Sequence, residues 1–186
     1  TGSQDPFGLR RSALGIINII LDMKLDLYLM ELIESALYIY IDENGLAFDH
    51  NKVKYEIMDF FIGRIKNMFA DLGFKYDLID SVINRNTDNV YDVKLRINKI
   101  GNWLENEDLT GILTAFNRVA SLASKTENDL VKRDLMEDDE RELYDSFNKI
   151  EEDVKDYIEK KEYDKALDLL VSLKDPIDNF FDKVMV

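Results

Sequence analysis

The sequence has 186 residues, a formal net charge of −14, no cysteine and a single histidine, His50. At roughly 150 residues per domain, this length predicts one domain or one domain with an appendage. The lack of cysteine excludes a disulfide framework, a thiolate zinc site and a cysteine nucleophile within the sequence. One histidine excludes two-histidine zinc motifs. No run of about 18 apolar residues is present, so no membrane-spanning helix is predicted, and we expect a cytoplasmic protein.

Apolar residues recur at helical spacing along almost the whole chain, and no segment alternates as a convincing strand would. The predicted class is therefore all-α, a helical bundle of about eight or nine helices. Aspartates suited to N-cap positions stand near the expected helix starts, and Gly73 suits a helix stop. The aspartates are Asp5, Asp26, Asp49, Asp88, Asp138 and Asp175, and the expected helices cover residues 7–21, 29–40, 52–72, 76–84, 90–104, 107–125, 138–158, 166–173 and 176–184.

The first two expected helices are the most hydrophobic part of the chain. The first is apolar on most sides, which indicates burial on more than one face or a larger interface. We therefore divide the chain into an N-terminal helical segment, residues 1–48, and a helical domain, residues 49–186. A polar stretch at residues 126–141 forms an internal joint, and both ends of the sequence resemble cuts within a longer protein.

Three polar features have ordinary structural explanations. His50 follows an expected N-cap and has no partner nearby in sequence for acid–base catalysis. The acidic residues 137–140 stand at a helix start, where the helix dipole favours negative charge. Residues 42–45 lack the spacing of a calcium-binding loop, and the chain has no glycine-rich phosphate loop. We therefore predict no catalytic residue and no metal site.

Charge is unevenly distributed along the chain. Residues 1–50 carry −5, residues 51–125 carry +1 and residues 126–186 carry −10. Binding to nucleic acid depends on Lys and Arg that neutralise phosphates. Only the middle part of the chain is therefore suited to that role, and the candidate RNA-binding residues are Lys54, Arg64, Lys94, Arg96, Lys99, Asn117, Arg118 and Lys125.

Four of the polar residues form a strip on the helix expected at 107–125: Asn117, Arg118, Ser121 and Lys125. The ordinary explanation is the solvated face of an amphipathic helix. The alternative is recognition of unstacked RNA bases, with an aromatic ring as a stacking surface. The aromatic candidates for that stacking are Tyr55, Phe74 and Tyr76.

Four segments of the sequence are similar to one known family. They are residues 1–15 (TGSQDPFGLRRSALG), 74–82 (FKYDLIDSV), 115–120 (AFNRVA) and 173–186 (LKDPIDNFFDKVMV). In this order they resemble segments of the β subunit of the bacterial two-subunit (α2β2) glycyl-tRNA synthetase. The first resembles the junction after its HD-like domain, and the last resembles its C-terminal end. The chain is thus identified as the C-terminal region of such a subunit.

The resemblance implies a DALR-type helical anticodon-binding domain, as in arginyl-tRNA synthetases. The parent enzyme joins glycine to its tRNA with ATP and Mg, and its catalytic centre belongs chiefly to the α subunit. We therefore expect a non-catalytic module without a cofactor of its own that binds the anticodon arm of tRNA(Gly). The expected partners are that tRNA, the remainder of the β subunit and the α subunit, with neither DNA nor a membrane. Asn117 replaces a lysine that is commoner in the family.

An alternative function remains open at this stage. The chain would be a helical scaffold that docks other parts of the synthetase and touches RNA little. The hydrophobic first helix favours this alternative, because exposed apolar area usually marks a site for a partner.

Overall fold

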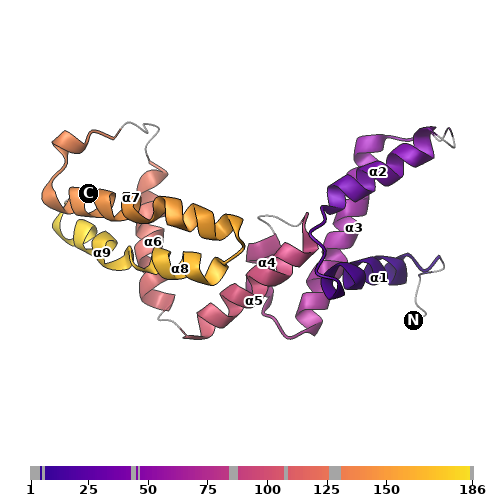
Figure 1. The fold of residues 1–186 in the computed structure, drawn as a ribbon, viewed down its shortest axis with the longest axis horizontal. Coiled ribbons are helices and arrows are strands. Elements are labelled where there is room, and N and C mark those ends of the chain that lie inside the picture. Colours follow the sequence, from indigo (N-terminus) through magenta and orange to yellow (C-terminus); the bar gives the residue numbers. More distant parts are fainter. Residues whose placement is uncertain are drawn as a thin grey trace. The chain divides into compact units, whose positions relative to one another are not determined.

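The computed structural model describes residue 5 and residues 7–42, 45, 47–83, 88–106, 109–125 and 131–184. Within these residues the chain forms nine α-helices and one short 3-10 helix, with no strand (Figure 1). The all-α prediction is confirmed. None of the helices described here combines the length and hydropathy that a membrane crossing requires.

The chain divides into two compact units, unit 1 (Thr1–Gly101) and unit 2 (Asn102–Val186), and the division falls within α5. Unit 1 contains α1 (Leu9–Asp22), α2 (Leu29–Asp42), α3 (His50–Asp71), α4 (Tyr76–Ile83) and most of α5 (Val90–Asn106). Unit 2 contains α6 (Leu109–Ala123), η1 (Arg133–Leu135), α7 (Asp138–Glu159), α8 (Tyr163–Val171) and α9 (Lys174–Lys183).

Unit 1 is built on α3, on which α1, α2 and α4 all pack. The inner side chains of α3 include Ile65 and Phe69, which are 0% and 1% exposed. Because α1 and α2 bury their inner faces on α3, the structure groups all three helices in one unit. This grouping differs from the predicted boundary between residues 48 and 49.

The two ends of α3 form as the sequence predicts. Asp49 is the N-cap, and its carboxylate accepts a hydrogen bond from the backbone N–H of Lys52 at 3.0 Å. Gly73 follows the helix with a φ of +93°, a left-handed conformation that glycine adopts without strain. The backbone N–H of Phe74 then donates to the carbonyl of Phe69 at 3.2 Å. This bond satisfies one of the carbonyls that the end of a helix leaves open.

The predicted start of α1 is wrong. The helix begins at Leu9, after an N-cap at Gly8 whose φ is +68°, and no side chain caps it. Asp5 does not reach the helix with its side chain as an N-cap; its carbonyl accepts a hydrogen bond from the N–H of Gly8 at 3.1 Å. The turn at Gly8 thus separates Asp5 from the helix that it was expected to cap.

Two further predicted caps have different partners from those expected. Asp88 does not cap α5; its carboxylate accepts from the backbone N–H of Met30 at 2.6 Å, in the first turn of α2. Asn89 caps α5 instead, accepting from the backbone N–H of Asp92 at 2.9 Å. Asp26, the expected cap of α2, accepts a hydrogen bond from the side-chain amide of Asn89. These side chains tie the starts of α2 and α5 together.

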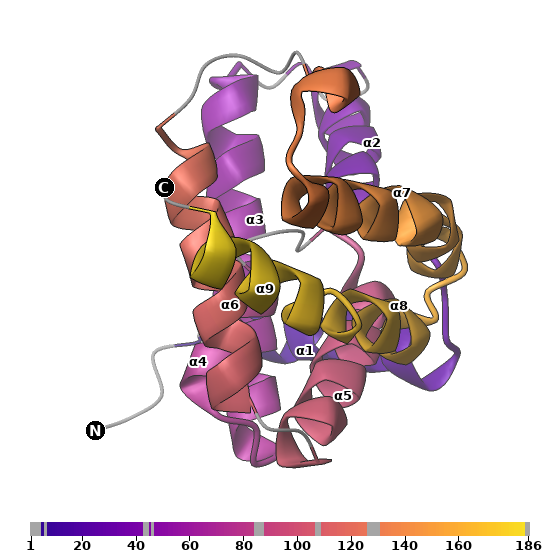
Figure 2. The same ribbon diagram turned by 90° about the vertical axis from the view of Figure 1, so that its left-hand side faces the viewer.

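Unit 2 surrounds a core to which α6, α7 and α9 contribute. The buried residues Ala115, Ile150, Leu173 and Ile177 form its centre. Figure 2 shows α9 lying across α6. α9 begins at Lys174, two residues before the start that the Asp175 cap predicts, and Leu173 occupies the N-cap position.

The acidic start of α7 has the structural role that the sequence predicts for it. The backbone N–H of Glu137 donates to the carboxylate of Glu140 at 2.7 Å. Asp138, Asp139 and Glu140 all lie in the first turn. Among the described residues, no three His, Asp or Glu side chains are grouped to hold a metal ion. Residues 126–130 of the predicted joint lie outside the described residues.

The ion pair between Arg96 and Asp92 predicts a stability effect. Asp92 is 4% exposed, and its carboxylate lies 2.8 Å from Nε of Arg96. Removing one partner of an ion pair takes away part of what offsets the cost of burying the other charge. Arg96→Ala should therefore lower the free energy of unfolding by about 1–3 kcal/mol, measured by urea denaturation. Lys94→Ala on the same helix should change it by less than about 0.5 kcal/mol, and equal effects of the two changes would contradict the prediction.

Candidate nucleic-acid interface

A groove of about 500 Å³ lies beside α6 in unit 2. Its residues on and just after α6 recur at intervals of three or four, so they share one face of the helix. Phe181 of α9 forms the other side. The groove is lined by Thr114, Asn117, Arg118, Ser121, Leu122, Lys125 and Phe181.

The opposite face of α6 explains why this strip points outward. Ala115 is fully buried against the core residues Leu173 and Ile177 of unit 2. Burial of that face leaves the polar face of the helix uncovered. The structure therefore brings together the four residues of the predicted polar strip and adds Phe181 to them.

Arg118 is held in position by residues of α9. Its guanidinium carbon lies 4.4 Å from the centroid of the Phe181 ring. The guanidinium nitrogens lie 3.4 Å from a carboxylate oxygen of Asp178 and 3.7 Å from one of Asp182. Lys174 also contacts Asp178, at 3.0 Å. The Arg118 side chain is 36% exposed, and ion pairs at such exposure contribute about 0–1 kcal/mol, so an incoming anion can exchange with these carboxylates.

Asn117 and Lys125 complete the polar side of the groove, and both are exposed. Within the described part of the chain, no carboxylate lies within ion-pair distance of Lys125. The groove therefore combines an exposed ammonium group, a guanidinium on an aromatic ring and a neutral amide. These groups suit a phosphate and an unpaired base.

The other five candidates lie in unit 1, Lys54 and Arg64 on α3 and the rest on α5. The structure shows carboxylate partners for Lys54 and Arg96. Lys54 pairs with Glu34 of α2, and this hydrogen bond raises the pKa of Lys54 and lowers the pKa of Glu34. Arg96 pairs with Asp92, as described above. Lys94 and Lys99 are half-buried on α5.

His50 contributes to the contact between α2 and α3. Its Nε2 lies 3.6 Å from a carboxylate oxygen of Glu34, and its ring centroid lies 5.6 Å from that of Tyr38. These neighbours make His50 part of the packing between the two helices.

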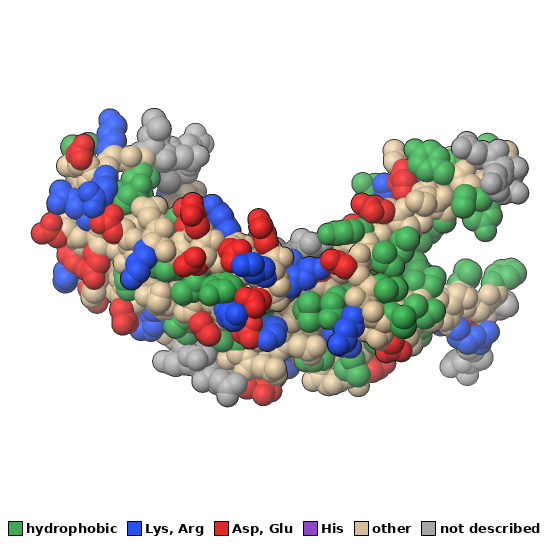
Figure 3. All heavy atoms as spheres, viewed as in Figure 1, with side chains coloured by type: hydrophobic (Ala, Val, Ile, Leu, Met, Phe, Trp, Pro, Cys, Tyr) green, Lys and Arg blue, Asp and Glu red, His purple; other side chains and the backbone are tan. Residues whose placement is uncertain are grey.

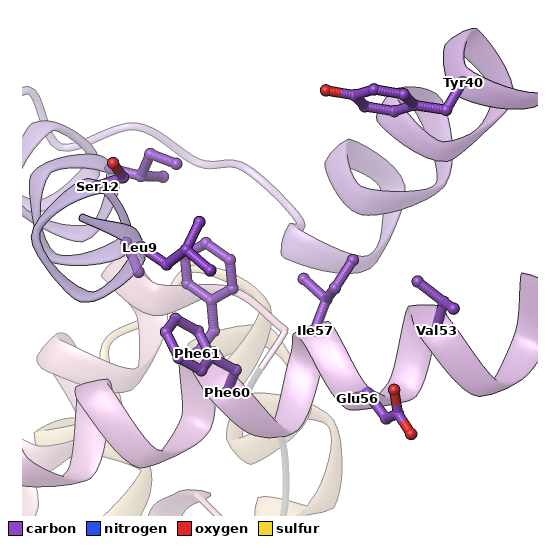
Figure 4. Close-up of a pocket in the computed structure, with 10 residues that line it drawn as sticks. Leu9, Ser12, Tyr40, Val53, Glu56, Ile57, Phe60 and Phe61 are labelled. Carbon is purple, nitrogen blue, oxygen red and sulfur yellow. The ribbon is translucent and has the colours of Figure 1, made fainter. Parts of the chain in front are cut away.

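A second groove, about 600 Å³ in volume, lies between α1, α2 and α3 of unit 1 and is almost entirely apolar. Figure 4 shows Ile57 and Val53 of α3 pointing toward Tyr40 of α2, and Leu9 of α1 beside Phe61. Figure 3 shows hydrophobic side chains gathered over the same helices. The groove is lined by Leu9, Ser12, Ala13, Ile16, Tyr40, Val53, Glu56, Ile57, Phe60 and Phe61.

Many apolar side chains around this second groove are uncovered. Leu9 is 58% exposed, Ile16 43% and Tyr40 54%. A smaller apolar hollow adjoins the groove and shares Ile16, Tyr40, Ile57 and Phe61 with it. Exposed apolar patches of this kind mark sites for a protein partner, a ligand or a membrane.

Phe181 is the residue that the sequence interpretation missed. The rings expected to stack on bases were Tyr55, Phe74 and Tyr76. Those three lie in unit 1, and Phe74 packs edge-on against Phe69 at 6.1 Å between centroids. Phe181 could have been found only by knowing that α9 crosses α6, since 63 positions separate it from Arg118.

Comparisons with known proteins cover the whole chain. A family model described as glycyl-tRNA synthetase beta subunit matches residues 1–84, and one described as DALR anticodon binding domain matches residues 112–186. Similar curated relatives are glycine–tRNA ligase beta subunits, 44% identical in Clostridioides difficile and 36% identical in both Desulforamulus reducens and Natranaerobius thermophilus. Each alignment covers 100% of this chain and 27% of the relative, at the relative's C-terminal end.

Proposed function

Because the chain is similar along its whole length to glycyl-tRNA synthetase β subunits, we propose that it is a member of this family and binds the anticodon arm of tRNA(Gly) through the groove beside α6. One observation carries this proposal. Every residue that lines the groove falls within residues 112–186, the part that matches the DALR anticodon binding domain. The chain spans about a quarter of the length of its curated relatives, so its tRNA, its partner subunits and its place in the enzyme are all part of the proposal.

The chemistry of the groove supports contact with an unstacked nucleotide. Arg118 has one face on Phe181, and its exposed edge can donate to a phosphate or to base acceptors. The carboxylates of Asp178 and Asp182 can accept hydrogen bonds from amino groups of bases. Lys125 adds a charge for the backbone, since neutralisation of phosphates supplies much of the affinity for RNA.

In this proposal the chain contributes binding and no chemical step. ATP and Mg serve the glycylation of the tRNA in the complete synthetase, chiefly in its α subunit, and this chain holds neither. Such a subunit works where tRNA is charged, so we expect it in the cytoplasm. Its protein partners are then the remainder of the β subunit and the α subunit.

Removal of the two cations of the groove tests the proposal. The double change Arg118→Ala and Lys125→Ala should weaken binding of tRNA(Gly) at least about tenfold at low salt, because two phosphate contacts are lost. The slope of log K against log salt should fall by about two. Both quantities are measured by fluorescence anisotropy with labelled tRNA, on this chain and on the intact synthetase.

A matched control removes two lysines elsewhere in unit 2. Lys155 and Lys160 on α7 are exposed and pair with Glu151 and Asp156. Their double change to Ala should leave the affinity for tRNA within about twofold. An equal loss in both double variants would reject the groove as the site. Equal affinity of the wild-type chain for an anticodon-swapped tRNA would reject specific recognition of the anticodon.

Asn117 provides a test in the opposite direction. It lines the groove beside Arg118, at a position where the family resemblance implies a lysine. Asn117→Lys adds a cation at an exposed position, so tRNA affinity should rise about threefold or more and the salt slope should steepen by about one. A change to Gln at the same position keeps the amide and should leave both quantities unchanged. A lysine variant that binds no better than wild type would contradict an RNA contact at this position.

A second candidate function is assembly of the synthetase, which the apolar groove of unit 1 favours. In this proposal the groove between α1, α2 and α3 receives an apolar segment from the remainder of the β subunit. That remainder is covalently linked in the relatives, so its effective concentration at the groove is high. This function is compatible with RNA binding, because the two grooves belong to different units.

A charge placed in the apolar groove tests the assembly function. Leu9 is 58% exposed, so Leu9→Glu should not unfold unit 1, but it should weaken binding of this chain to the separately expressed remainder of the β subunit at least about tenfold. Met23→Glu, at a residue that is 68% exposed and outside the groove, is the control. Binding is measured by calorimetry. Retention of full affinity in Leu9→Glu would exclude the groove as the docking site.

A further inference from the structure

A third groove, of about 650 Å³, lies between α1 and α3 of unit 1 and is lined by both polar and apolar side chains; we call it the polar groove. Its α1 residues are spaced four apart, and its α3 residues follow the intervals of one helical face. It is lined by Arg10, Leu14, Asn18, Arg64, Asn67, Met68, Asp71 and Leu72.

This groove and the apolar groove lie on opposite sides of α1. The α1 residues of the apolar groove are Leu9, Ser12, Ala13 and Ile16, and those of the polar groove are Arg10, Leu14 and Asn18. At 100° per residue, the centres of these two sets are about 150° apart on the helix. On α3, residues up to Phe61 line the apolar groove, and residues from Arg64 onward line the polar groove. The two surfaces are therefore separate sites.

Two arginines from different helices contribute positive charge to the polar groove. Within the described part of the chain, neither Arg10 nor Arg64 forms an ion pair with a carboxylate. Arg64 is fixed in place, because its Nη1 donates to the carbonyl of Phe60 at 3.0 Å and its guanidinium carbon lies 3.6 Å from the Phe60 ring centroid. An arginine fixed in this way loses less conformational freedom when it binds an anion.

The other lining residues fit a nucleotide backbone. Asn18 and Asn67 are exposed amides that donate hydrogen bonds without adding charge. Leu72, which is 64% exposed, offers apolar area to a sugar. Asp71 is the one acidic residue among those that line the groove, so the two arginines give it a net charge of +1.

We propose that this groove binds the phosphodiester backbone of the tRNA, as a second RNA contact in addition to the groove beside α6. The inference rests on the proposed function, since it takes RNA as the ligand. Contacts of this type position an RNA and carry no sequence information. The groove therefore contributes affinity that is the same for tRNA(Gly) and for an anticodon-swapped tRNA.

The test uses three single variants in the intact synthetase. Arg10→Ala should weaken tRNA binding about fivefold and lower the salt slope by about one. Asp71→Asn removes the opposing charge at the last residue of α3 and should strengthen binding about twofold. Arg11→Ala removes the same charge from the neighbouring position, which does not line the groove, and should leave affinity unchanged. Affinity and salt slope are measured with both tRNAs, and circular dichroism verifies the fold of each variant.

Each outcome has a defined meaning. Equal losses in Arg10→Ala and Arg11→Ala would overturn the groove in favour of a general charge effect. No change in Arg10→Ala, with a loss in the Arg118 and Lys125 double variant, would overturn this inference and leave the proposed function intact. No change in any of these variants would overturn both this inference and the proposed function. Inorganic phosphate substituted for chloride at constant ionic strength should compete weakly with tRNA, and strong competition that is lost in Arg10→Ala would assign the groove to free phosphate.

Discussion

Burial of the inner face of α3 organises unit 1, because α1, α2 and α4 all pack on this helix. Ile65 and Phe69 lie at the centre of this contact and are almost completely buried. Each such side chain contributes about 1.5–3 kcal/mol by leaving water. α3 has 22 residues, and the three helices packed on it do not cover its whole length. Ile57 and Phe60 therefore stay half-exposed. The same helix that holds unit 1 together therefore also supplies the floor of two grooves.

Unit 2 combines the groove beside α6 with a strongly acidic part of the chain. Residues 126–186 carry −10, and the carboxylates of Asp178 and Asp182 lie beside Arg118. Negative charges within about 8–10 Å of a cation weaken the attraction that this cation exerts on a distant anion. Long-range attraction of RNA to this groove is therefore weak, and close contacts must provide most of the recognition. A carboxylate beside the guanidinium also disfavours a phosphate at the wrong position, which increases the selectivity of the contact.

The sequence predicts what depends on neighbouring residues and misses what depends on distant ones. The positions of the helices follow from apolar periodicity, and both ends of α3 follow from Asp49 and Gly73. The role of Asp88 does not follow from the residues around it, because its partner Met30 is 58 positions away. The same limit applies to the site. The polar strip on α6 is visible in the sequence, whereas the carboxylates beside Arg118 and the partner of Lys54 come from other helices.

The composition of α1 can be understood from its place between two grooves. A helix with a single buried face needs about half of its surface polar, and the sequence of α1 is far more apolar than that. Ala13, Ile17, Ile20 and Leu21 are buried within unit 1, and Leu9 and Ile16 face the apolar groove. The polar residues Arg10, Arg11, Asn18 and Asp22 lie on the remaining side, and Ser12 lines the apolar groove. The apolar residues of α1 therefore serve the core of unit 1 and also line the apolar groove, and Arg10 and Asn18 lie where the helix borders the third groove.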